Sequence, residues 1–499
     1  MSSFDTQAYD LPLSRTSFLA ALEEGRGRAM LHASRHGLGG FHRELIHACL
    51  HALQVDPQID KGRGEWTLAL LEIGNALDDC LPAILEGLEP AVVLAEGLDF
   101  WDRVERCNVL AALASRGLTG ARERLLQIAV DDREWHFGPP LGADHFVDIE
   151  GIDGLVALAE GLGPRARELC REDLFALVVR GDVNEQADAA NEDLVAEARS
   201  ALAEAAPRCA GAAALLGMLT EDSMDGASPA SSSPDPFVDG TEQKGSGQGS
   251  SGRPAFAYED GPHDNADAAI EWVESRAEDA PEPASRFGVL SAWSRKASPR
   301  ALEQLARAWC STGSALRRIL YAQAFCKKIP PPFVTQEMIA MARSPSSKLA
   351  WVTTQALSGV TDPMVRALAL ERIADSGLQV VSLELLQSNY QASDGKLLES
   401  AFNELIPCGL SDLRSIHSTS RRILDGDKRC SLARGLLELA RPDRPELALL
   451  QLAAYELNPC AECRVRHAKA LHAIDALPAW LRDEVLHDPE SSTEDWPWV

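Results

Sequence analysis

The 499-residue chain is poor in aromatic side chains and has neither a long apolar run nor a series of alternating apolar and polar residues. Aromatic residues make up 6% of it, which favours helices over sheets because strands are enriched in aromatic and β-branched residues. No run of about 18 uninterrupted apolar residues occurs, so the sequence predicts no membrane-spanning helix. The first residues, MSSFDTQAYDLPLSR, lack a basic start followed by an apolar segment, so we expect no secretory signal.

The sequence also lacks the short motifs that mark common catalytic and nucleotide-binding sites. It has no Walker loop, no dinucleotide-binding fingerprint and no nucleophile elbow. Its eleven cysteines are odd in number and scattered, which predicts reduced thiols without structural disulfides and a cytoplasmic location. We therefore expect no cofactor, and we favour a protein without enzymatic activity.

Charge is abundant but mostly of one sign. The chain has a formal charge of -27, and 27 Lys/Arg against 31 Asp/Glu in residues 263–499 leave 21 against 44, net -23, in residues 1–262. An acidic surface of this size repels phosphate backbones and anionic lipid heads, so neither nucleic acid nor a membrane is expected as a partner. A basic protein suits it better, although such acidity also serves solubility alone.

One stretch near the end of the chain, NPCAECRVRHAKAL at residues 458–471, has the pattern of a capped helix. Asn458 is expected to cap it and Pro459 to be its first helical residue, where a missing N–H costs nothing. The helical period then places five residues on one face. These residues are Cys460, Cys463, His467, Leu471 and Ile474.

This pattern resembles the second helix of a HEAT-type repeat: Asp/Asn-Pro, three residues, Val-Arg, two residues, then paired small residues and Ala-Leu. The same register recurs at residues 344–357, in shortened form at 362–366 and without a cap at 316–324. The spacing of the two longest matches is roughly three units of about 38 residues, within the range of helical repeats. Independent amphipathic helices with similar caps are the alternative.

The resemblance implies an all-α, armadillo-type fold, a HEAT-like helical-repeat α-solenoid in two halves. We expect an acidic helical domain at residues 1–220 and a HEAT-like domain at residues 263–499. Residues 221–262 are rich in Ser, Gly, Pro and Asp, and such a segment cannot bury enough apolar surface to fold, so it predicts a disordered linker.

Two regions contain candidate functional residues outside this pattern. Residues 131–154 show no helical period, which predicts a long loop that contacts a partner protein. Its candidate contacts are Trp135, Phe137, Asp144, Phe146 and Asp148. The same loop would alternatively hold a cation or an acid–base pair through Glu134, His136, Asp144, His145 and Asp148, or be purely structural.

Histidines four residues apart on two neighbouring helices form the second region. Four imidazoles that converge there would make a metal site. They are His32, His36, His47 and His51. Exposed or core-packed histidines are the alternative, and we likewise favour core packing over metal binding for Cys460, Cys463 and His467.

Proteins with HEAT-type repeats mostly act as binding scaffolds, so the resemblance implies a non-enzymatic, protein-binding scaffold or adaptor. The alternative is a metal-binding enzyme or regulator that uses the histidines or residues 131–153. HEAT-like folds also host lyase and DNA-repair roles, but the acidic surface argues against binding to a duplex.

Overall fold

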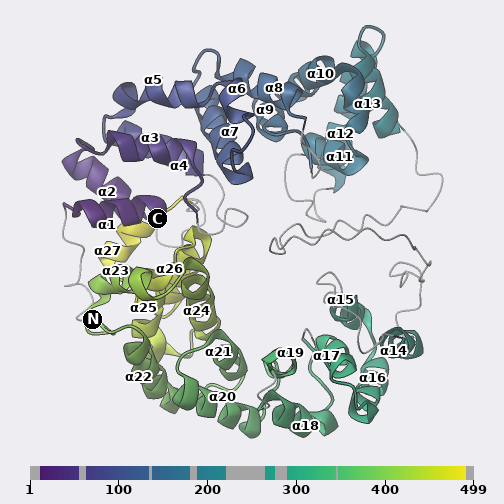
Figure 1. Ribbon diagram of the computed structural model, residues 1–499, viewed down its shortest axis with the longest axis vertical. Helices are drawn as coiled ribbons and strands as arrows, with labels where there is room; N and C mark the ends of the chain where they lie inside the picture. The colour runs from purple at the N-terminus through teal and green to yellow at the C-terminus, as the bar shows by residue number, and fades with distance from the viewer. Residues whose placement is uncertain are drawn as a thin grey trace. The chain divides into compact units, whose positions relative to one another are not determined.

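The computed structural model describes residues 12–54, 63–133, 138–179, 188–220, 265–275, 289–326, 328–343 and 347–489 (Figure 1). All regular elements in these ranges are helices, which confirms the all-α prediction. None of the helices in the described residues is long and apolar enough to cross a membrane. The expected linker at residues 221–262 lies outside the described residues.

The chain forms two compact units, and both ends of the chain belong to the first. This unit consists of residues 1–227, 458–469 and 477–499, and the second consists of residues 228–457 and 470–476. The division therefore differs from the expected C-terminal domain of residues 263–499, because the last segments pack on the N-terminal helices. Sequence patterns could not reveal this, since the pairing joins residues more than 400 positions apart.

Most helices of the first unit are 8 to 18 residues long. They are α1 (Arg15–Glu23), α2 (Gly27–His36), α3 (His42–Leu50), α4 (Arg63–Ile73), α5 (Leu77–Gly87), α6 (Pro90–Val93), α7 (Phe100–Ser115), α8 (Ala121–Asp131), α9 (Ala143–Glu150), α10 (Ile152–Leu162), α11 (Arg171–Val179), α12 (Asp188–Ala205), α13 (Ala210–Thr220), the start of α26 (Ala461–Ala473) and α27 (Ala479–Val485). Each of α7 to α10 packs on the next one or two helices along the chain. Leucine, alanine and other apolar side chains fill the core between them.

A close approach of backbones fixes α4 against α7. A Cβ at Gly64 would lie 2.6 Å from the carbonyl carbon of Asn108, so only glycine fits where the two helices meet. Trp66 and Leu70, on the same helix, are buried. This packing fixes both ends of the segment between α4 and α7, residues 74–99.

The second unit contains twelve described α-helices that lie wholly within it. They are α14 (Ala266–Glu274), α15 (Val289–Lys296), α16 (Pro299–Ser311), α17 (Ala315–Gln323), α18 (Pro332–Ala342), α19 (Ser347–Leu357), α20 (Pro363–Ser376), α21 (Val380–Gln387), α22 (Gly395–Leu405), α23 (Leu413–Ile423), α24 (Gly426–Leu439) and α25 (Ala448–Leu457). From α16 to α20, each helix packs on the next helix, on the one after it, or on both, and α21 packs on α24.

Side-chain caps begin several of these helices. Ser298 accepts a hydrogen bond from the N–H of Ala301 at 3.2 Å, and Asp362 caps α20 in the same way. The pattern at residues 316–324 lacks the Asp/Asn-Pro cap of the other matches, and a serine serves as the cap instead. Ser314 accepts from the N–H of Arg317 at 3.4 Å and starts α17.

The capped helix expected at residues 458–471 begins later than predicted. Helix α26 starts at Ala461 rather than at Pro459. Asn458 still acts on its start, because its side-chain oxygen accepts a hydrogen bond from the N–H of Cys460 at 3.0 Å. The predicted burial is confirmed for Cys460, Cys463, His467 and Leu471.

Candidate functional site

The expected loop at residues 131–154 is partly helical, which corrects the prediction from the sequence. It contains α9, and α10 begins at Ile152. Gly142 and Gly151 lie before these helices with φ of 78° and 68°, values that favour glycine. An eight-residue helix between such glycines spans too few turns for its period to be visible in the sequence.

Only part of the predicted partner surface in this region reaches solvent. Asp144 and Asp148, four residues apart on α9, are exposed. Phe146 is 6% exposed and belongs to the core, so it is not available as the predicted partner contact. Trp135 and Phe137 lie outside the described residues, and their predicted role is untested.

The four histidines of the predicted metal site lie in two close pairs. The ring centroids of His32 and His36 lie 5.5 Å apart, and those of His47 and His51 lie 4.2 Å apart. His32 is buried, and its Nδ1 accepts a hydrogen bond from the backbone N–H of Leu13 at 3.0 Å. A nitrogen that accepts this bond has no lone pair left for a metal ion.

The second pair, His47 and His51, contacts α7 through His51. His51 Nδ1 lies 2.8 Å from a carboxylate oxygen of Asp102, whose other oxygen accepts from the N–H of Ala52 at 2.8 Å. Burial, and then the neighbouring His51, lowers the pKa of His47, which favours the neutral imidazole. In the described part of the chain, no three His, Cys, Asp or Glu side chains are grouped closely enough to hold a metal ion. The described residues therefore show no set of ligands for the predicted metal site.

The cysteines are poorly suited to nucleophilic chemistry. Burial raises the pKa of Cys49 and of Cys107 well above the ordinary range of a thiol. Cys170 is exposed, yet partial desolvation and hydrogen bonding with Asp173 raise its pKa to about 11. A thiol with such a pKa is almost entirely protonated at neutral pH and reacts slowly.

A group of buried charges joins the two ends of the chain within the first unit. Three arginines and three carboxylates there are each at most 3% exposed. We call these six residues the terminal clasp: Glu24, Arg26, Arg28, Arg464, Glu484 and Asp488. Equal numbers of positive and negative groups keep the cluster neutral, which a buried cluster of charges requires.

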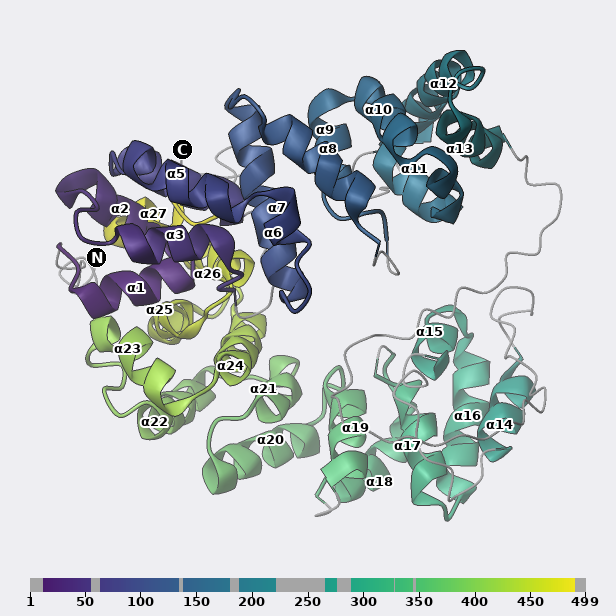
Figure 2. The same cartoon turned by 45° about the horizontal axis from the view of Figure 1, so that its top comes forward.

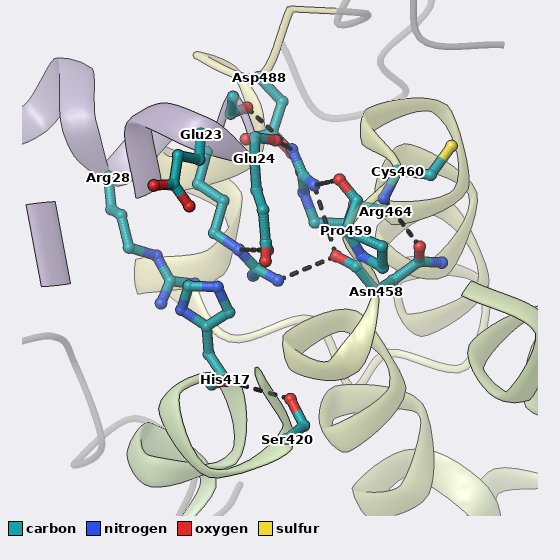
Figure 3. Close-up of polar contacts among 12 residues, drawn as sticks. Glu23, Glu24, Arg28, His417, Ser420, Asn458, Pro459, Cys460, Arg464 and Asp488 are labelled. Carbon is teal, nitrogen blue, oxygen red and sulfur yellow. Dashed lines mark hydrogen bonds and ion pairs between the residues drawn. The ribbon is translucent and has the colours of Figure 1, made fainter. Parts of the chain in front are cut away.

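Arg464 is the centre of the clasp (Figure 3). Its Nε donates to Asp488 at 2.8 Å, and its terminal nitrogens donate to the carbonyl oxygens of Pro459 at 2.7 Å and Gly25 at 2.8 Å. Asp488 also accepts from the backbone N–H of Gly27 at 2.6 Å. The guanidinium of Arg464 thus links the start of α26 to the turn between α1 and α2 through hydrogen bonds.

Two further arginines at the start of α2 also contact the C-terminal segments. Arg26 donates to the carbonyl oxygen of Asn458 at 2.9 Å, and Arg28 donates to Glu484 of α27 at 2.7 Å. Gly27 lies between them, and a Cβ there would lie 1.8 Å from the carbonyl oxygen of Glu484. The clasp is sealed from water, so it is suited to holding helices together and not to chemistry on a substrate.

A second group of charges lies on the outside of the first unit, from α4 to the start of α7. Nine Asp or Glu and no Lys or Arg occur in residues 64–102. Four of them pair closely with basic side chains, since Arg116 pairs with Glu65 and Glu72, Arg124 with Glu89, and His51 with Asp102. The other five are exposed, and one of them, Asp79, lies 3.9 Å from the ring of His42. We call these five the acidic surface: Asp78, Asp79, Glu86, Glu96 and Asp99.

Large apolar side chains lie in the same segment. Phe100 is 57% exposed and Val92 is 41% exposed. The ring of Phe100 meets the ring of Trp101 edge to face, with centroids 5.2 Å apart. Exposed aromatic residues beside charge are typical of protein interfaces. The sequence interpretation missed this segment, although a run of acidic residues without basic ones could have indicated it.

No protein-family model, no curated protein and no solved structure matches this chain. Its function must therefore be inferred from its own residues.

Proposed function

We propose that this protein is a non-enzymatic, protein-binding scaffold or adaptor made of HEAT-like helical repeats. We further propose that the acidic surface binds a basic partner protein, and that the protein acts in the cytoplasm. All eleven cysteines lie in the described residues and none forms a disulfide, which supports a reducing compartment.

Contacts between turns in the second unit support the repeat architecture. Asn389, in the turn after α21, donates to the carbonyl oxygen of Val360 at 2.7 Å and accepts from the N–H of Asp362 at 2.8 Å. The next link joins Tyr390 to Glu446, at 3.0 Å between hydroxyl and carboxylate. Stacked helix pairs bring equivalent turns into contact in this way.

The observation that carries the proposed binding function is the acidic surface beside Phe100. Five exposed carboxylates, of which Asp79 alone lies near a basic side chain within the described residues, raise the local concentration of a basic partner and steer its approach. Phe100 and Val92 then offer apolar area that a partner can cover. Solubility alone explains exposed acidic residues, but it does not explain exposed aromatic ones among them.

The test is capture of partners from a native lysate by the immobilised full-length chain, read by mass spectrometry. We expect one basic protein to be retained at low salt and released at high salt, since exposed charge pairs are screened. A double variant, Glu86→Lys/Glu96→Lys, should lose this protein because it reverses the sign of the central part of the surface.

The matched control is Glu192→Lys/Glu197→Lys, which makes the same change of charge at exposed positions of α12 in the same unit. This control should retain the partner. Equal capture by both double variants would show that only the total charge matters, and the proposed surface would be rejected. Retention of no specific protein would reject the scaffold.

A further inference from the structure

The second unit contains a positively charged segment, although the chain as a whole is strongly acidic. Residues 289–361, which span α15 to α19, contain 10 Lys/Arg against 2 Asp/Glu, net +8, in a chain of net charge -27. Random scatter of charges in an acidic chain does not concentrate basic residues in this manner. The segment therefore has a field opposite in sign to that of the acidic surface.

Several of these cations are close in sequence to the starts of α16 and α18. Both helices are labelled in Figure 2. Arg295, Lys296 and Arg300 flank the turn between α15 and α16, and Lys328 precedes α18. All four are exposed, and none pairs with an acidic side chain within the ranges that the structure describes. Their charge is thus available to a partner.

Exposed apolar side chains lie beside these cations. Ile329 is 68% exposed and Phe333 is 51% exposed, the first adjacent to Lys328 in the chain and the second on the first turn of α18. Arg307 of α16 lies 5.8 Å from the centroid of the Phe333 ring, which places α16 and α18 next to each other here. Arg300 shares a face of α16 with Arg307, because seven residues are almost two full turns.

A neighbouring turn lies beside these side chains. Ile329 lies 3.8 Å from the position that a Cβ at Gly359 would occupy, so the turns before α18 and before α20 touch. The acidic side chain nearest in sequence, Glu303, is already paired with Arg307 at 2.7 Å. We call this set the basic edge: Arg295, Lys296, Arg300, Arg307, Lys328, Ile329 and Phe333.

We propose that the basic edge binds an acidic protein segment that also carries large apolar side chains. Its carboxylates would pair with Arg300 and Lys328, and an apolar side chain would cover Ile329 and Phe333. Apolar anchors surrounded by complementary charge are the usual composition of such docking sites. Nucleic acid fits less well, since the net charge of -27 repels a phosphate backbone.

This site goes beyond the scaffold proposed above, because it adds a second docking surface with the opposite charge preference. An adaptor with two such surfaces can hold a basic and an acidic partner together. The two surfaces are in separate units, so variants of one leave the other intact.

The test uses fluorescence anisotropy with the full-length chain. The probe is a fluorescein-labelled peptide of repeated Glu-Leu-Glu-Phe units, and its Lys-Leu-Lys-Phe counterpart and a single-stranded DNA are compared with it. We expect the acidic peptide to bind, and its affinity to fall as salt rises from about 50 to about 300 mM. Arg300→Glu/Lys328→Glu should weaken this binding by about tenfold or more.

Two further variants separate the site from total charge. Lys396→Glu/Arg441→Glu makes the same change of charge at exposed positions of the second unit and should leave the affinity within about twofold. Phe333→Ala keeps the charge and should also weaken binding, with circular dichroism showing an intact fold.

Three results would overturn the proposal. The first is equal binding of the acidic peptide by the two double variants, or no binding by the native chain. The second is tighter binding of the DNA than of the acidic peptide, which would indicate a nucleic-acid surface. The third is a native dimer that Arg300→Glu/Lys328→Glu converts to a monomer in light scattering, which would assign the edge to a second copy of this chain.

Discussion

Replacement of Arg464 by alanine should open the first unit at the joint between the two ends of the chain. The arginine is fully buried, and its guanidinium is shared among one carboxylate and four carbonyl oxygens. Alanine removes all of these donors at once. Asp488 would then be a buried carboxylate without its cation, although it still accepts a hydrogen bond from the N–H of Gly27.

The cost follows from the loss of one partner in a buried ion pair. Such a loss is worth about 3–5 kcal/mol, because the remaining charge is uncompensated. Each buried carbonyl oxygen that loses its donor adds roughly 1 kcal/mol or more, although these terms do not sum independently. We expect a total of about 4–6 kcal/mol, comparable with the whole stability of about 5–15 kcal/mol of an ordinary domain.

The assay is native-state hydrogen exchange of the amides of α2 and α26, which reports the free energy of opening for each helix. In Arg464→Ala the protection of both helices should fall together. Arg466→Ala, an exposed position on the same helix, is the control and should change this free energy by less than about 0.5 kcal/mol. A loss below about 1 kcal/mol in Arg464→Ala, or a loss confined to α26, would refute the proposed role of the clasp.

Three further predictions concern other packed positions. Gly27→Ala should cost about 2 kcal/mol or more in urea unfolding, since its Cβ would overlap the carbonyl oxygen of Glu484. Asn389→Ala should cost about 1–3 kcal/mol in the same measurement, because the carbonyl oxygen of Val360 and the N–H of Asp362, both in the turn before α20, lose their side-chain partner. Burial, and then the nearby His36, lowers the pKa of His32 below 6.5. The stability that neutral His32 contributes is therefore present above pH 6.5 and is lost as the pH falls, and His32→Gln should flatten this dependence in thermal melts from about pH 7.5 to about pH 5.

Local features of the sequence predicted the helices well where a cap and an apolar period coincide. Asp362-Pro363 begins α20 as expected, because the side-chain cap and the fixed φ of proline act within a few residues. At Asn458-Pro459 the same signal predicted a helix start two residues too early. There the carbonyl oxygens of both residues accept hydrogen bonds from Arg464, so they are held outside the helix.

Long-range pairing could not be predicted from such local signals. The residue types alone give no reason to pair Arg26 with Asn458, since arginine and asparagine are both usually exposed. The buried state of Phe146 was also missed, because α9 is too short to show its period. The acidic surface, by contrast, needed only a count of charges along residues 64–102, and the basic edge only the same count along residues 289–361.

Charged residues occur in three different settings in this protein, and the setting indicates whether they stabilise the fold or are available to a partner. In the terminal clasp, arginines and carboxylates are equal in number and sealed from water, so their charges cancel and hold the fold. On the acidic surface and on the basic edge, exposed charges of one sign lie in the same segments as Phe100 or Phe333, and most of them have no partner of opposite charge among the described residues. Stability does not require either arrangement, because exposed like charges repel and exposed aromatic rings lose apolar burial. A partner that brings the opposite charge and an apolar side chain would satisfy both, and for that reason we assign binding to these two surfaces and architecture to the clasp.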